Sequence, residues 1–193
     1  MLADFNNPQH IGKYDIDNDV IDESQTAPPV SIEQSEAVAI DGNIYVPYPK
    51  DGSDVARPDI YVYDIGADSW STITGTSPPP ERYFAAIMKD DQQRLYVVGG
   101  IDNGAGTSYT RADRLDVNTG TWEQLPDFPG PSGTGDASTG LDDEGNPWII
   151  NGVSGSSGTQ LSNSYVFDTS TDSWVSVSLP FTDEESNSGA FIK

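Results

Sequence analysis

The chain has 193 residues, of which 31 are acidic and 9 are basic, giving a formal net charge of −22. It contains no cysteine, which excludes disulfides, thiolate nucleophiles and cysteine ligands to a metal. Because an acidic surface without a basic patch repels phosphates, we expect neither nucleic acid nor an anionic membrane surface as a partner.

The N-terminal segment lacks the basic and apolar regions of a secretory signal, and no stretch of the chain approaches about 18 apolar residues. We therefore predict no membrane insertion and a location in the cytoplasm or in a virion. The single histidine, His10, lies in this segment without a nearby nucleophile or orienting group. A general base needs both, so we predict no catalytic role for it.

Three aspartates near the N-terminus, Asp15, Asp17 and Asp19, alternate as they do in calcium-binding loops. However, Val20 stands where the turn glycine belongs and Thr26 where the bidentate glutamate belongs. The pattern therefore favours the tip of a β-hairpin, and we predict no metal site and no cofactor.

The rest of the chain consists of short runs rich in β-branched and aromatic residues, bounded by Gly, Pro, Asn and Asp. Such runs predict antiparallel strands joined by tight turns. They fall into three groups of four, at 36–40, 43–48, 60–65 and 69–73; at 83–89, 94–98, 111–117 and 122–125; and at 137–141, 147–151, 164–168 and 173–177. No segment has the period of a helix, so we predict an all-β fold of four-stranded units.

Three tryptophans, Trp70, Trp122 and Trp174, recur at intervals of 52 residues. Each follows an apolar or aromatic residue with six residues in between, and these partners are Tyr63, Leu115 and Phe167. A fixed period of about 50 residues is typical of blades, solenoids and other repeat arrays. Large rings at this spacing are expected to fill the wedge between neighbouring twisted sheets.

These motifs resemble the kelch-repeat β-propellers. That family has a Gly-Gly doublet after an apolar strand, and here Gly99 and Gly100 follow 95–98. The segment 80–83 resembles the proline-arginine entry to a blade, whereas the doublet is replaced by Asn151-Gly152 and by Pro47-Tyr48 in the other two periods. The resemblance implies a kelch-like β-propeller of four-stranded antiparallel blades.

We predict one propeller domain over 1–193, with about four blades. Three blades are complete, and the fourth is split between the termini; the ranges are about 31–75, 80–125 and 134–178, and 1–30 with 187–193. Residues 14–21 align with the repeated segments 63–70, 115–122 and 167–174, with Ile21 in place of the tryptophan. The ring closes within one chain, between chains, or as part of a longer protein, and the sequence leaves these alternatives open.

The acids are mostly aspartate and the lysines are few, a balance that resembles proteins of halophiles. Repulsion among so many carboxylates is screened at molar salt, so we predict that counterions at high salt stabilise the fold. The expected source is a halophilic archaeon or bacterium, or one of its viruses.

The predicted function is a non-enzymatic module for protein interaction or assembly, with protein partners or copies of itself, in a virion or surface appendage. The alternative is a carbohydrate-binding or glycan-processing propeller of the sialidase kind, although 116–122 has the wrong spacing for the sialidase box. Loops between the second and third strands and between blades should emerge on one face. Arginines and aromatics dominate interfaces, so the candidate binding residues are Arg57, Arg82, Tyr109 and Phe128. For Arg82, the resemblance offers a structural role inside the ring as the alternative.

Overall fold

The computed structural model describes residues 2–4, 7–33, 35–50, 56–102, 107–130, 134–135, 137–150, 152–154, 159–160 and 163–178, and of 2–4, 7–10, 154 and 159–160 it describes the backbone alone. Every element in these ranges is a β-strand. No helix that is long and apolar enough to cross a membrane occurs among them.

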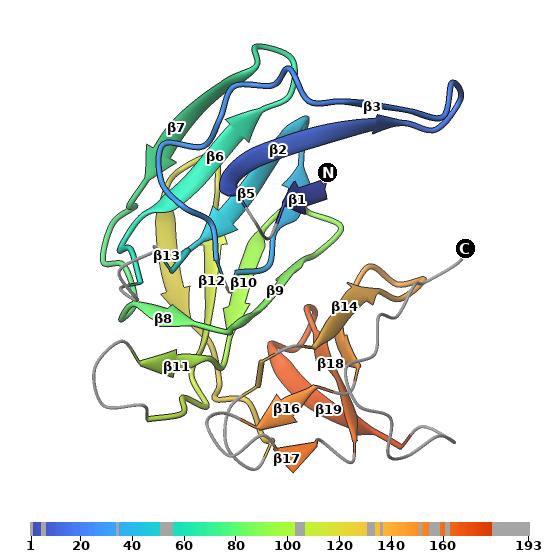
Figure 1. Cartoon of the computed structure of the whole chain (residues 1–193). Coiled ribbons are helices and arrows are strands. Elements are labelled where there is room, and N and C mark those ends of the chain that lie inside the picture. Colours follow the sequence, from blue (N-terminus) through green and yellow to red (C-terminus); the bar gives the residue numbers. More distant parts are fainter. Residues whose placement is uncertain are drawn as a thin grey trace.

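Three four-stranded antiparallel sheets dominate the fold, and we name them blades 1, 2 and 3 (Figure 1). Blade 1 contains β4 (Val38–Ile40), β5 (Asn43–Pro47), β6 (Ile60–Asp64) and β7 (Ser69–Ile73). Blade 2 contains β9 (Ala86–Lys89), β10 (Leu95–Val98), β12 (Ala112–Asp116) and β13 (Thr121–Gln124). Blade 3 contains β14 (Ser138–Leu141), β15 (Pro147–Ile150), β18 (Ser164–Asp168) and β19 (Ser173–Val177). The prediction of an all-β fold built from four-stranded units is confirmed.

The first strand of blade 2 differs from the prediction. The predicted strand at 83–89 is two strands, β8 (Arg82–Tyr83) and β9, separated by Phe84, whose φ is 57°. Because this positive φ turns the chain, β8 leaves the blade and pairs with β11 (Ile101–Asp102). Blade 3 also contains a separate small ladder in the connection between β15 and β18, formed by β16 (Val153–Ser154) and β17 (Thr159–Gln160).

The N-terminus forms a three-stranded sheet with the order β1–β2–β3, made of β1 (Leu2–Asp4), β2 (Asn7–Asp15) and β3 (Val20–Asp22). In β2–β3, Tyr14 lies opposite Ile21, as Tyr63 lies opposite Trp70 in blade 1. The β2–β3 hairpin thus has the same register as the β6–β7 hairpin of blade 1. The C-terminal part of the predicted split blade, 187–193, lies outside the described residues.

The hairpin turns repeat from blade to blade. The carboxylate of Asp15 accepts hydrogen bonds from the backbone N–H groups of Asp17 and Asn18, at 3.0 and 3.2 Å. Equivalent turns begin at Asp64, Asp116 and Asp168, and each turn ends at a residue with positive φ, which is Asp19, Asp68, Gly120 or Asp172. Aspartate and glycine suit these two positions because aspartate bonds its own turn and both tolerate the left-handed region. The Asp15–Asp19 alternation is therefore turn chemistry at a hairpin tip.

The three repeated tryptophans link consecutive blades. The indole N–H of Trp122 donates to the carbonyl of Thr74 at 3.1 Å, and that of Trp174 donates to Pro126 at 3.0 Å. Both acceptors lie within two residues of the end of the outer strand of the preceding blade. Trp70 donates in the same way to Thr26, at 2.9 Å, just after β3. The N-terminal segment is therefore joined to blade 1 by the same kind of hydrogen bond that joins consecutive blades.

Two apolar cores lie between the blades. The first joins blades 1 and 2 and contains residues from both, including Ile40, Ile60, Leu95, Leu115 and Trp122. The second joins blades 2 and 3 and includes Met88, Tyr96, Phe128, Ile149 and Phe167. Each core thus lies between two neighbouring sheets and combines aliphatic side chains with aromatic rings.

The Gly-Gly doublet adopts positive φ at both positions, 69° at Gly99 and 89° at Gly100. The N–H of Gly100 donates to the carbonyl of Thr134 at the entry to blade 3, at 2.9 Å. Gly152 and Tyr48, at the positions of Gly100 in the other periods, also have positive φ, 106° and 47°. The positive φ at this position is therefore retained in blades 1 and 3, although they lack the Gly-Gly doublet.

Candidate functional site

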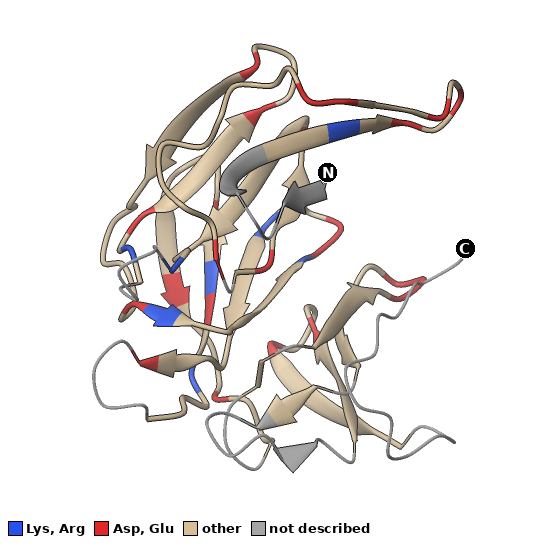
Figure 2. Ribbon diagram, in the orientation of Figure 1, with Lys and Arg blue, Asp and Glu red and all other residues tan. Residues whose placement is uncertain are grey.

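One end of the blades carries the longer loops, and we name it the loop face. In an antiparallel blade, the connection between the second and third strands and the connection to the next blade leave from the same end. The short hairpin turns occupy the other end, where aspartates gather (Figure 2). Charges of both signs occur at both ends. At the turn end, Arg94 pairs with Asp90 and Arg114 pairs with Asp172, and the loop end carries Glu81 and Asp102 as well as arginines.

A groove of about 540 Å³ opens on the loop face. Its lining is rich in proline and contains one tyrosine and two acids, namely Pro58, Pro78, Pro79, Pro80, Glu81, Asp102 and Tyr109. The three consecutive prolines belong to the linker that joins blades 1 and 2. Proline fixes φ near −65°, so this wall has little freedom to lose when a partner binds.

Backbone hydrogen bonds hold both walls of the groove. At the start of the proline linker, the N–H of Thr76 donates to the carbonyl of Gly120 at 2.8 Å. At its end, β8 pairs with β11, which places Arg82 opposite Asp102. On the other wall, the N–H of Tyr109 donates to the carbonyl of Gly100 at 2.9 Å. The groove is therefore fixed in shape by the fold.

A buried ionic cluster lies beside the groove. One terminal nitrogen of Arg82, Nη2, donates to Asp113 Oδ2 and to the carbonyl of Val97, both at 2.8 Å. Arg111 Nη2 donates to the other oxygen of Asp113, Oδ1, at 2.7 Å. Burial lowers the pKa of Arg82, and the nearby Asp113 carboxylate opposes that effect. Arg82 Nη1 also donates to the carbonyl of Pro80, at 3.4 Å, which connects the cluster to the proline wall.

The four residues predicted to bind a partner divide into two pairs. Tyr109 lines the groove, and Arg57 is exposed next to Pro58 of its lining. Arg82 and Phe128 are interior residues, with exposed fractions of 1% and 2%. The prediction that these two residues belong to a binding surface is therefore wrong. For Arg82, the position agrees with the alternative, a structural role in the interior.

Phe128 points inward because aromatic residues of blade 3 surround it. Its ring centroid lies 4.6 Å from that of Tyr165 and 5.3 Å from that of Trp174.

The proline wall and Glu81 were not predicted as binding residues from the sequence. The run of three prolines, which cannot lie within a strand, was the signal that could have found them.

Among the residues that the structure describes, no group of three His, Cys, Asp or Glu side chains is placed to hold a metal ion. The carboxylate of Asp116, in the phrase compared with the sialidase box, accepts hydrogen bonds from the backbone of its own turn, at Asn118 and Thr119. This carboxylate therefore stabilises the hairpin.

Comparisons with known proteins agree with this fold. The Kelch motif matches residues 91–129, which cover most of blade 2. Kelch domain-containing protein 10 of Xenopus tropicalis is 28% identical over 74 residues, as is that of Xenopus laevis; the match covers 37% of this chain and 18% of each relative. The solved structure of YjhT superposes with a TM-score of 0.71 at 12% identity, covering 86% of this chain and 61% of that one. The chain therefore spans only part of the proteins that it matches. It carries a kelch motif, and its sheets are the blades of a kelch-like β-propeller.

Proposed function

We propose that the chain is a non-enzymatic protein-interaction module and that the loop-face groove is its partner surface. The observation that carries this proposal is the groove itself, in which prolines and Tyr109 form a wall held by backbone hydrogen bonds. Tyrosine is common among residues that dominate binding energy, and a rigid wall keeps the entropy loss on association small. The kelch motif supports the same class of function.

The charges in and around the groove indicate which kind of partner would bind there. Glu81 and Asp102 line the groove, and the chain as a whole carries a net charge of −22. A partner segment with apolar side chains and basic groups would be steered toward this surface and would find complementary carboxylates there.

Site-directed photocrosslinking tests this proposal in cells that make the protein. A photoreactive amino acid at Tyr109 is expected to capture one defined protein, whereas the same group at Asn118, exposed at the turn end, captures none. With the captured partner in hand, Tyr109→Ala should weaken binding about tenfold, or about 1.4 kcal/mol. Equal capture at both positions would contradict the assignment of the loop face.

We further propose that this module works in a halophile or a virus of one, in the cytoplasm or within a virion or surface appendage. The aspartates of the repeated turns support this proposal, because they concentrate like charges at one end of the molecule. The single domain over 1–193, with its split blade, is proposed as the unit that assembles.

Salt dependence of stability tests the halophilic part. Raising KCl from about 0.1 M to about 3 M shortens the screening length from about 10 Å to less than about 3 Å. We expect the midpoint of thermal unfolding to rise by about 10 °C, which corresponds to about 3 kcal/mol for a chain of this size. A titration with sucrose, which is excluded from the surface without screening charge, is the control. Equal midpoints at low and high KCl would rule out halophilic adaptation.

A further inference from the structure

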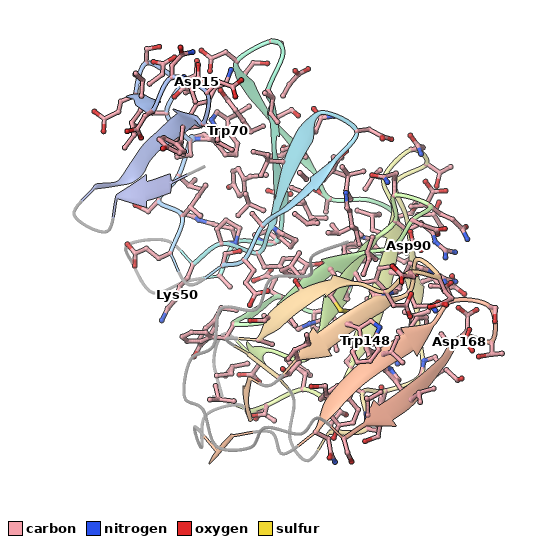
Figure 3. All side chains as sticks on the ribbon, turned by 90° about the vertical axis from the view of Figure 1, so that its right-hand side faces the viewer. Asp15, Lys50, Trp70, Asp90, Trp148 and Asp168 are labelled. Atoms are coloured by element: carbon pink, nitrogen blue, oxygen red, sulfur yellow. The ribbon has the colours of Figure 1, made fainter. Side chains whose placement is uncertain are left out.

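A second pocket, of about 430 Å³, lies between the N-terminal hairpin and blade 1. Figure 3 shows the N-terminal sheet and blade 1, with Asp15 labelled in the hairpin and Trp70 in blade 1, and Figure 1 shows that the hairpin tip extends away from β7. Residues from both parts line it, including Lys13, Tyr14, Asp22, Gln25, Tyr63 and Ile65. Its volume falls within the range of small-molecule sites, and it lies away from the loop-face groove.

The two sides of this pocket are joined by Asp68. Its Oδ1 accepts from the hydroxyl of Tyr63 at 2.6 Å and from the N–H of Thr26 at 2.8 Å, and its Oδ2 accepts from the Thr26 hydroxyl at 3.1 Å. The hydrogen bond from Tyr63 lowers the pKa of Asp68, so this carboxylate is ionised at neutral pH. Trp70 closes the connection by donating to the carbonyl of Thr26. The pocket is therefore formed before any ligand arrives.

Apolar surface is left uncovered in the pocket. Tyr14 and Ile65 both line it, and each has an exposed fraction of 44%. The hydroxyl of Tyr14 donates to Asp19 at 2.5 Å, which holds the ring in place. A fixed aromatic ring at the edge of a pocket offers a flat apolar face to a ligand.

Polar groups at the rim both accept and donate hydrogen bonds. Hydrogen bonds from Ser24 lower the pKa of Asp22, so its carboxylate is an acceptor at neutral pH, and one of its oxygens receives the N–H of Ser24 at 3.0 Å. Lys13 carries an ammonium donor. Gln25 accepts the backbone N–H of Lys13 at 3.2 Å, and its side chain also hydrogen-bonds to Asp22.

The charges narrow the class of ligand. Asp22 and Asp68 outnumber Lys13 among the charged lining residues, so the pocket disfavours an anion. Hydroxyl groups both donate and accept, so they match the mixture of Asp22, Gln25 and Lys13 at the rim. From this arrangement we infer that the pocket binds a neutral sugar, with an apolar face of the sugar ring on Tyr14 and its hydroxyls at Asp22, Gln25 and Lys13.

Saturation-transfer NMR on the whole chain tests this inference, with neutral hexoses and their disaccharides as probes. Tyr14→Ala is expected to weaken binding at least tenfold, or about 1.4 kcal/mol. Tyr14→Phe keeps the ring but loses its hydrogen bond to Asp19, so it should weaken binding less than Tyr14→Ala does. Ile16→Ala is the matched control, since Ile16 is 82% exposed on the same hairpin and does not line the pocket.

Three results would overturn the inference: no neutral sugar binds, glucuronate or choline binds in preference, or Tyr14→Ala binds as the parent does. Circular dichroism checks that Tyr14→Ala is folded. If it is not, Asp22→Asn replaces it, with a loss of at least fivefold expected for the same sugars. Tyr109→Ala in the loop-face groove should leave sugar binding unchanged, so this test stands apart from that of the proposed function.

Discussion

Replacing Gly99 with alanine is expected to lower the free energy of unfolding by about 3 kcal/mol or more. Gly99 has a φ of 69°, where an L side chain is strained. A β-carbon there would lie 2.3 Å from the nitrogen and 2.8 Å from the oxygen of Thr134. These are backbone atoms at the entry to blade 3, and moving them would also stretch the hydrogen bond from Gly100 to Thr134.

Substitutions of two other glycines distinguish the effect of backbone strain from the effect of the close contact. Gly42 has a φ of 79°, but a β-carbon added there would meet no atom within 4 Å, so Gly42→Ala should cost about 1 kcal/mol from strain alone. Gly66 lies in an exposed turn without positive φ, and the nearest atom would be 3.4 Å away, so Gly66→Ala should change stability by less than about 0.5 kcal/mol. Urea unfolding measures all three variants. Equal losses at Gly42 and Gly99 would show that the contact between blades 2 and 3 is loose.

Much of this fold was predictable because its signals are local. Alternating apolar residues and turn residues mark each strand, and the aspartate that begins each hairpin turn bonds to the backbone two and three residues later. The register of Tyr14 opposite Ile21 followed from the same phrase that pairs Tyr63 with Trp70. Local chemistry repeated at a fixed period therefore predicts blades well.

The candidate site depended on contacts that no local pattern encodes. Phe128 and Arg82 lie in linkers that resemble surface loops, yet Tyr165, Trp174 and Asp113 from distant parts of the chain draw their side chains inward. The direction of a loop side chain is decided by such tertiary partners. For the same reason, the sequence did not predict the pocket at the hairpin, whose walls meet through a hydrogen bond between residues 42 positions apart.

The backbone conformations of Phe84 and Tyr48, which both have positive φ, were likewise not predictable from the local sequence. Phenylalanine and tyrosine favour strands, and neither favours positive φ. Tyr48 is held there because its ring is buried, at 1% exposure, in the core between blades 1 and 2. Tertiary packing thus overrides a local preference at the position that glycine occupies in blades 2 and 3.

The second large effect is expected at Asp113, where alanine should lower the free energy of unfolding by about 3–5 kcal/mol. The side chains of Arg82 and Asp113 are 0% and 1% exposed, and they meet at 2.8 Å. Arginine stays protonated, so removing Asp113 leaves a buried cation whose hydrogen bonds to the carbonyls of Val97 and Pro80 do not neutralise its charge.

A double-mutant cycle tests whether the pairing of Arg82 with Asp113 accounts for the loss of stability. Arg82→Met should cost less than Asp113→Ala, about 2 kcal/mol, because Arg111 still pairs with Asp113. In the double variant, neither buried charge is left alone, so its loss should fall short of the sum of the single losses by about 1–3 kcal/mol. Asp143→Ala, at an exposed position in the turn between β14 and β15, is the control and should change stability by less than about 0.5 kcal/mol. Strict additivity of the two single losses would mean that Arg82 and Asp113 do not stabilise each other, and that the wall beside the loop-face groove is held by its backbone hydrogen bonds alone.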